Sequence, residues 1–310
     1  MPKAWVPGPR KLRGEESEGG RSPPPKVVVP LRKAHAVVIG RMALGESDRL
    51  VTFYTREYGK VRGVAKAARR PRSRFGGSLE LFTQGQLVFF ETERSDLARV
   101  DSFDIAHPFQ SVRENLERLT HGSWVVECLG RLSADRDPNP ALYGLLLRTL
   151  RALEGCAWPE RAAFCFAFRA VDFLGHRLRL DRCLTCGKPS PFSRGSARLD
   201  FTAGGLVCEP CATYGNDGVD LSGAAVGGLR RLRTLSWDEA MGASLPPSLE
   251  AEMVGALEAQ MTSLIGQVPR TIRFRTQTRR ARSPALSGGP AAAGRGPAAV
   301  GVETAPGGSP

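Results

Sequence analysis

Apolar and polar positions change their spacing once along the chain, near residue 107. Before that point, apolar residues come in short runs that mostly end at turn residues, which is typical of short β-strands. The runs expected to be strands are 34–39, 50–55, 61–67, 79–83, 86–91 and 97–102. Strands this short and this closely spaced predict a small barrel, and the OB-fold is a frequent small barrel among nucleic-acid-binding proteins.

After His107-Pro108 the apolar residues recur every three to four positions, which is the spacing of one face of an α-helix. Asn139-Pro140 and Trp158-Pro159 each carry a proline suited to a first helical turn, so helices are expected to begin there. Further helices are expected over 222–236 and 248–267. The aromatic stripe within the helix after Pro159 is expected to lie in the core rather than to line a binding groove.

Basic residues outnumber acidic ones along the chain. The 44 Lys and Arg against 31 Asp and Glu give a net charge of +13. This excess favours a polyanionic partner, because cationic side chains displace the counterions of phosphates. An anionic membrane surface, or solubility alone, is the alternative explanation. No apolar run is long enough for a membrane-spanning helix and no secretion signal is visible, so we expect no membrane partner and a cytoplasmic protein.

One segment concentrates the positive charge: ten Lys or Arg and three acidic residues lie between positions 41 and 74. Four aromatic residues lie near these cations, at positions 53, 54, 58 and 75. Grooves for single-stranded nucleic acid combine cations with rings on which bases stack, although core aromatics beside a solvated loop would give the same composition. A second cluster, with six Arg and no acid in 270–282, either extends such a surface or begins a solubilising tail.

Four of the seven cysteines form two C-x-x-C pairs, Cys183 with Cys186 and Cys208 with Cys211, separated by 21 residues. This spacing predicts one tetrahedral Zn²⁺ held by four thiolates. No histidine is near either pair, so the zinc is expected to be structural rather than catalytic. A redox role for the second pair would leave the first pair unexplained. The other three cysteines, at 128, 156 and 165, are expected to be buried thiols.

The sequence contains no nucleotide-binding loop, nucleophile elbow, zinc-protease motif or dinucleotide-binding fingerprint. The four histidines are scattered singly. Glu46 with Asp48 is a possible nuclease carboxylate pair, but the two residues fit a strand-connecting loop equally well. We therefore expect no enzymatic activity.

These patterns predict an α+β multidomain chain with an N-terminal OB-fold barrel, an α-helical body and an inserted four-cysteine zinc module. The expected parts are a disordered basic arm (1–32), an OB-fold DNA-binding domain (33–107), a first helical part (108–180), the zinc module (181–215), a second helical part with an Arg-rich end (216–282) and a disordered tail (283–310). The arm and the tail are assigned from their richness in glycine and proline and their few large apolar residues.

Three segments resemble the N-terminal domain of the RecO family: GESDRLVTF (45–53), YGKVRGVAK (58–66) and RRPRSRFGG (69–77). The resemblance resumes at Leu174-Gly175, continues through both cysteine pairs, and covers roughly residues 31 to 280. The arm and the tail have no counterpart in the family. Arg273-Phe274-Arg275-Thr276-Gln277 stands where family members usually carry a short Lys-Ser-containing stretch, so no family role is carried over to the C-terminus.

The resemblance implies a recombination mediator of the RecF pathway that works at the bacterial nucleoid without catalysis. Such a protein binds single- and double-stranded DNA, anneals complementary strands coated with single-strand-binding protein, and works with RecR to load RecA. It also implies a helical-body pocket for the acidic C-terminal tail of single-strand-binding protein. The residues that the resemblance implies to contact DNA are Arg49, Arg62, Lys66, Arg69, Arg70, Arg72 and Arg74.

Two other classes of protein remain as alternatives. A zinc-ribbon transcription or RNA-binding adaptor would bind duplexes in a sequence-specific way. A metal-dependent nuclease would cut its DNA substrate in the presence of Mg²⁺.

Overall fold

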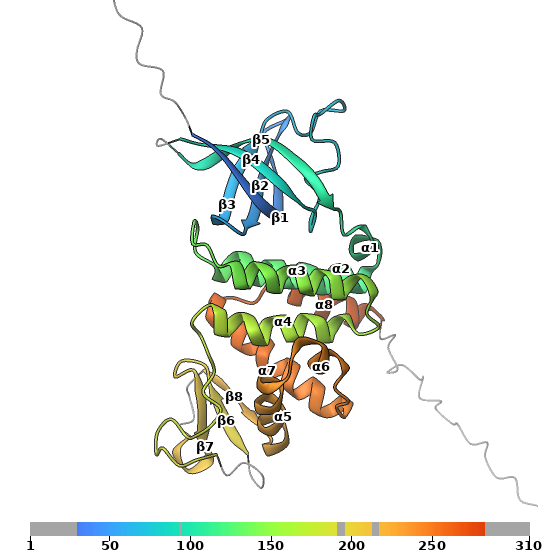
Figure 1. Ribbon diagram of the computed structural model, residues 1–310. Helices are drawn as coiled ribbons and strands as arrows, with labels where there is room; N and C mark the ends of the chain where they lie inside the picture. Colours follow the sequence, from blue (N-terminus) through green and yellow to red (C-terminus); the bar gives the residue numbers. More distant parts are fainter. Residues whose placement is uncertain (1–29, 93–94, 191–195, 213–216, 283–310) are drawn as a thin grey trace, which may run out of the picture.

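The computed structural model describes residues 30–92, 95–190, 196–212 and 217–282, so the expected tail and nearly all of the expected arm lie outside the described residues. Figure 1 shows a β-barrel at one end of the molecule, a layered helical body in the middle, and a small sheet at the other end. This arrangement confirms the predicted fold class.

The barrel consists of five strands: β1 (Leu31–Leu44), β2 (Asp48–Thr55), β3 (Gly59–Ala65), β4 (Gln84–Thr92) and β5 (Ser95–His107). They close in the order β1-β2-β3-β5-β4, and all neighbours are antiparallel except β3 and β5. This is the topology of an OB-fold. Its interior is filled by alternate apolar side chains such as Val51, Phe53, Leu87 and Val100, as expected for strands that face a core on one side.

The expected strand over 79–83 is wrong, because this segment is a turn. Leu79 is buried inside the barrel, whereas Phe82 adopts a positive φ of 71° and is buried in the core of the helical body. Val38 bonds the segment twice, accepting from the Phe82 N–H (2.8 Å) and donating to the Thr83 carbonyl (2.9 Å). The residues of this run are therefore apolar because they are buried in two different cores, not because they form a strand of the sheet.

The helical body begins with α1 (Gln110–Glu114), α2 (Leu116–Leu132), α3 (Pro140–Gly155) and α4 (Pro159–Phe173). It continues after the small sheet with α5 (Gly223–Thr234), α6 (Trp237–Gly242), α7 (Pro247–Ile265) and α8 (Arg270–Arg282). Asn115, Asn139 and Ser222 cap α2, α3 and α5 through their side chains. Among the described helices, none has the length and apolar character needed to cross a membrane.

The stripe on α4 is core, as expected: Phe164 and Phe168 are buried and stack with centroids 6.4 Å apart. The helical core also includes residues of the barrel wall, among them Val37, Ile39 and Tyr54. One apolar core therefore joins the barrel to the helices.

Lys60 fixes the same junction by polar contacts. Its ammonium donates to the carbonyls of Gly130 and Ser133, both at 2.7 Å, and lies 3.2 Å from an oxygen of Asp135. These carbonyls lie at the C-terminal end of α2, where backbone acceptors lack helical partners and positive charge is favoured. A barrel residue thus caps a helix of the body.

The small sheet has three antiparallel strands in the order β7-β6-β8: β6 (Ala197–Asp200), β7 (Gly205–Cys208) and β8 (Gly218–Leu221). A short 3-10 helix, η1 (Glu209–Cys211), follows β7. The sequence pattern predicted the cysteine pairs of this region but not its strands. The third strand, β8, lies beyond residue 215, where the zinc module was expected to end.

Candidate nucleic-acid interface and metal centre

The basic loop that follows β3 is tied to the start of β2 by Asp48. One carboxylate oxygen accepts from the Ala67 N–H (2.8 Å), and the other accepts from the Lys66 ammonium (2.7 Å). The hydrogen bond from Lys66, followed by that from Ala67, holds the pKa of Asp48 below its ordinary value. The backbone N–H of Arg69 donates to the Ser47 carbonyl at 2.9 Å. The loop is therefore fixed at its base.

Beyond this base the loop displays four exposed arginines, Arg69, Arg70, Arg72 and Arg74. Arg69 donates to the Gly45 carbonyl (2.9 Å). The side chains of Arg70 and Arg72 form no ion pair or hydrogen bond with any described residue. The loop thus presents guanidinium groups that are not neutralised by the fold.

Arg74 and the other three residues expected to contact DNA are engaged with acidic groups. Lys66 pairs with Asp48, Arg62 with Asp135 (3.3 Å), and Arg74 lies 3.8 Å from Asp101. Arg49 is half-buried and donates to Glu80 at 3.4 Å. These four cations add to the positive electrostatic potential of the surface, but the charge of each is already partly neutralised by an acidic neighbour.

The aromatic residues near these cations are mostly unavailable for stacking with bases. Phe53, Tyr54 and Phe75 are buried, and Tyr58 is half-buried against the ring of Phe89, with centroids 5.6 Å apart. These rings are therefore core residues rather than platforms for bases. The loop can attract DNA mainly through its positive charge.

Asp48 is also one half of the carboxylate pair considered for a nuclease. Its oxygens accept from Lys66, Ala67 and Ser47, whereas Glu46 is exposed. The contacts of Asp48 are those of a loop anchor, in agreement with the strand-connecting alternative.

A cleft of about 1020 Å³ lies between the barrel and α2. Its apolar floor includes Ile39, Leu81, Leu119 and Val126. The basic residues around it are Arg41, Lys60, Arg62, Arg113, Arg131 and Arg270, against the acids Glu127 and Asp135. These cations come from distant parts of the sequence, so no local motif could have indicated the cleft.

The Arg-rich segment 270–282 forms α8, which packs on α2. Glu127 of α2 accepts from the backbone N–H groups of Arg270 (2.9 Å) and Thr271 (3.0 Å) and from the Thr271 hydroxyl (2.8 Å). Burial tends to raise the pKa of Glu127, but these hydrogen bonds outweigh it and hold the pKa below its ordinary value. At least the first turn of this segment is therefore part of the fold.

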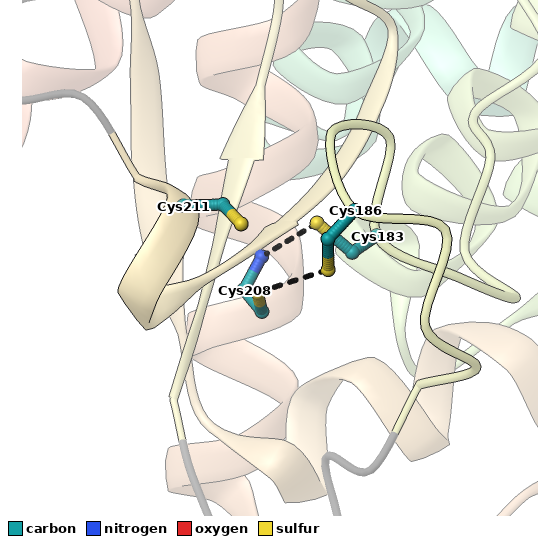
Figure 2. A group of neighbouring side chains, drawn as sticks. All are labelled: Cys183, Cys186, Cys208 and Cys211. Atoms are coloured by element: carbon teal, nitrogen blue, oxygen red, sulfur yellow. Dashed lines mark hydrogen bonds between the residues drawn. The ribbon is translucent and has the colours of Figure 1, made fainter.

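The four paired cysteines meet at one point, as Figure 2 shows. Cys183 and Cys186 come from the loop before β6, Cys208 ends β7, and Cys211 ends η1. All four sulfurs lie within 4.8 Å of one another, and those of Cys186 and Cys208 are 3.8 Å apart. The structure thus brings together the pairs that the spacing selected.

Backbone packing holds the two pairs in this position. Gly205 lies so close to the preceding loop that a Cβ there would be 2.7 Å from the Arg179 carbonyl oxygen. The Leu206 N–H donates to that same carbonyl at 3.0 Å, and the Leu184 N–H donates to the Leu206 carbonyl at 2.8 Å. A glycine is required at position 205 because the two chain segments touch there.

The surroundings of the sulfurs favour a thiolate at Cys183. Burial opposes ionisation, but backbone N–H groups of Cys186, Cys208 and Thr185 bond the sulfur and lower the pKa of Cys183 to about 6. The Cys208 N–H donates to this sulfur at 3.4 Å. The neighbouring sulfur of Cys208 raises the pKa of Cys211 to about 12, because the two sulfurs share a hydrogen bond.

These residues fit a metal ion. A tetrahedral four-thiolate zinc site with bonds of about 2.3 Å has sulfurs about 3.8 Å apart, which matches the pair at 3.8 Å. Such a closed set of four sulfurs leaves no position for water or substrate. The cysteine cluster can therefore bind a metal ion.

The remaining cysteines lie outside this cluster. Cys128 and Cys165 are buried, and burial raises the pKa of both thiols. Cys156 is half-buried, so it is more accessible than expected, and partial burial raises its pKa too.

Comparisons with known proteins agree with this architecture. Residues 31–109 match the family model described as Recombination protein O N terminal, and residues 113–271 match the model Recombination protein O C terminal. Several relatives carry the name DNA repair protein RecO. One from Myxococcus xanthus is 34% identical over 242 residues, which cover 78% of this chain and 96% of the relative.

Two further relatives cover similar lengths. The protein from an Anaeromyxobacter species is 36% identical over 244 residues, covering 78% of this chain and 94% of the relative. The protein from a Roseiflexus species is 30% identical over 266 residues, covering 83% and 90% of the two chains. Together with the barrel and the cysteine cluster, these matches show that the chain belongs to the RecO family.

Proposed function

We propose that this chain is a non-catalytic recombination mediator in DNA repair. It binds single- and double-stranded DNA, anneals complementary strands coated with single-strand-binding protein, and promotes RecA loading together with RecR. Membership of a family named for recombination, and relatives named for DNA repair, support this role. A protein that handles DNA in this way acts at the nucleoid, in the cytoplasm.

The observation that carries the proposal is the basic loop on the barrel. Asp48 fixes the base of this loop, and Arg70 and Arg72 extend from it without a described partner. Guanidinium groups without a partner in the fold can bind phosphates without first breaking an internal ion pair. Arg49, Arg62, Lys66, Arg69 and Arg74 are proposed to add to the positive field along the same strand path.

The cleft between the barrel and α2 supports a second contact, with the acidic C-terminal tail of single-strand-binding protein. Its apolar floor offers burial for apolar side chains of the tail, and its surrounding arginines offer partners for carboxylates. A mediator that holds both this tail and the DNA stays with coated strands while they pair.

The metal in this proposal is one structural Zn²⁺ held by Cys183, Cys186, Cys208 and Cys211. Four thiolates are a donor set that suits zinc, and the closed set supplies folding energy rather than reactivity. The zinc would neutralise the crowded sulfurs and hold the loop before β6 against β7.

The proposal is tested by DNA binding of the triple variant Arg69→Gln, Arg70→Gln and Arg72→Gln, measured by fluorescence anisotropy over a range of salt concentrations. The wild type, contacting about six phosphates, should show a slope of log affinity against log salt near about −4. Loss of three contacts should flatten the slope by about 2. The charge-matched control is Arg99→Gln, Arg148→Gln and Arg151→Gln, which changes exposed arginines outside the loop.

If the loop variant and the control bind DNA with the same affinity and the same salt slope, the loop is not the DNA-binding site. If the wild type itself fails to bind DNA, the whole proposal is wrong.

A further inference from the structure

A second cationic site lies beyond α4, in the half of the molecule away from the barrel. A hollow of about 560 Å³ is formed there by the chain segment 177–181 and the last turns of α5. Its charged lining is four arginines and one acid, Arg177, Arg179, Arg230, Arg233 and Asp181. Figure 1 shows α5 on the side of the helical body opposite to the barrel. The hollow is therefore separate from the basic loop.

The positive charge of this hollow is only partly compensated. Asp181 is engaged by the neighbouring Arg182 (2.9 Å), outside the hollow's lining. Asp172 lies 3.9 Å from Arg177 and 3.6 Å from Arg233, so one carboxylate is shared between two cations. Arg179 and Arg230 are exposed and form no ion pair with a described residue.

Arg233 is held in place at the base of the hollow. Its Nη1 donates to the Leu178 carbonyl at 2.7 Å, and its guanidinium lies over the ring of Phe168, 5.3 Å from the centroid. Burial lowers the pKa of Arg233, Asp172 acts in the opposite direction, and the charge of Arg177 lowers the pKa further. Because its surroundings disfavour the positive charge, an anion bound nearby would stabilise the guanidinium of Arg233. The contacts with Leu178 and Phe168 hold this charge in position before a ligand binds.

The chemistry of the hollow points to a phosphodiester backbone. Three exposed arginines around a fixed fourth provide planar donor groups that match phosphate oxygens. A single small anion would leave several of these charges unused, whereas a chain of phosphates engages them together. The net charge of +13 favours a polyanion of this kind.

We propose that this arginine hollow holds the backbone of a second DNA strand while the basic loop of the barrel holds the first. This inference rests on the proposed function, because annealing requires that two strands be held by the same protein. Neutralising both strands at once reduces the repulsion that slows their pairing.

The test is the number of labelled oligothymidylate strands bound per full-length chain, measured by analytical ultracentrifugation at low salt. Thymidine strands cannot pair with each other, so two strands per chain report two protein sites. The hollow variant is Arg177→Gln, Arg179→Gln and Arg230→Gln. The loop variant and the control with changes at 99, 148 and 151 are measured beside it.

At a strand concentration that just fills both sites of the wild type, the wild type and the control should bind two strands per chain, and the hollow and loop variants close to one. Affinity for the second strand should fall by about tenfold in the hollow variant, as expected for the loss of three phosphate contacts. Pyrophosphate should displace the second strand only weakly, because it spans fewer contacts than a backbone.

Two strands per chain in the hollow variant, with affinities equal to the control, would overturn the inference and leave DNA binding by the loop intact. Tight binding of polyglutamate at the hollow, without any change in DNA stoichiometry in the hollow variant, would also overturn it and assign the hollow to an acidic protein. Failure of the wild type to bind any strand would instead overturn the proposed function.

Discussion

Gly59 illustrates how a single residue fixes the position of the barrel against the helices. Its φ is +60°, a conformation that side chains other than glycine rarely adopt. A Cβ at this position would lie 2.0 Å from the backbone oxygen of Asp137, in the connection that follows α2. Lys60, the next residue, bonds the end of α2. The turn between β2 and β3 therefore packs directly on the backbone of the helical body.

Gly59→Ala should lower the free energy of unfolding by about 3 kcal/mol or more, because left-handed strain adds to a clash with rigid backbone. Gly45→Ala is the matched control, since Gly45 has the same φ of +60° and a Cβ added there would meet nothing within 4 Å. The control should lose only about 1–2 kcal/mol. Urea denaturation of both variants measures the difference, and equal losses would show that the close contact with Asp137 is unimportant.

At the residue scale, the sequence predicted well where chemistry depends on local spacing. The two C-x-x-C pairs indicated four residues whose sulfurs the structure brings within 4.8 Å. The role of Lys60 was not predictable, because its partners Gly130 and Ser133 are about 70 positions away along the chain. The same holds for the cleft, whose arginines come from both the barrel and the helices.

At the scale of elements, the first turn of α8 is capped by an acidic side chain of α2. Glu127 accepts three hydrogen bonds from Arg270 and Thr271, in the first turn of a helix that has no acidic residue of its own there. Unpaired N–H groups at a helix N-terminus favour a carboxylate nearby. This contact joins α8 to α2 and places Arg270 at the cleft.

Glu127→Gln should destabilise the protein by about 1–2 kcal/mol at pH 7, the range found for the loss of a helix cap. Because the pKa of Glu127 is lowered by folding, its contribution is complete above the unfolded pKa and is lost as pH falls through the folded pKa. The difference between wild type and variant should therefore shrink below about pH 4. Denaturant unfolding at several pH values measures it, with exposed Glu46→Gln as the control.

A pH-independent difference between the wild type and Glu127→Gln would contradict this account of α8. So would an equal loss of stability in Glu46→Gln.

The metal centre makes a prediction for the small sheet. Cys183→Ser should reduce the zinc content of the purified protein from about one ion per chain to near zero, because a three-thiolate set is no longer closed. Cys156→Ser, outside the cluster, should retain the metal. Elemental mass spectrometry measures both, and a wild type without bound metal would refute the site.

Removal of the metal should act on stability rather than on a chemical step. A chelator should lower the melting temperature of the wild type, since metal binding contributes to folding, and leave that of Cys183→Ser nearly unchanged. An equal effect of the chelator on both proteins would contradict a structural role for the metal.

Elements were predictable where a periodic pattern covers many residues, as in the helices that begin at Pro140 and Pro159. The segment 79–83 was misread because its apolar residues serve two different cores, which no local pattern distinguishes from a strand. The strands β6, β7 and β8 have only four residues each, too few to show an alternation, and their pairing joins distant positions.

At the scale of the whole molecule, positive charge is concentrated at places that differ in what surrounds them. The loop of the barrel presents arginines to solvent, the cleft combines arginines with an apolar floor, and the hollow beside α5 surrounds a fixed Arg233. Composition predicted the excess charge but not its distribution, because the arginines of the cleft and the hollow meet only after folding. This distribution agrees with the proposed function, in which separate basic surfaces hold DNA strands and a protein tail.

The most direct test of the account is the annealing of two complementary oligonucleotides coated with their cognate single-strand-binding protein, followed by fluorescence at two salt concentrations without ATP. We expect that the protein accelerates pairing, that higher salt reduces the acceleration, and that a denaturing gel shows intact strands. No acceleration would contradict the role as a mediator, and cut strands in the presence of Mg²⁺ would contradict a non-catalytic function.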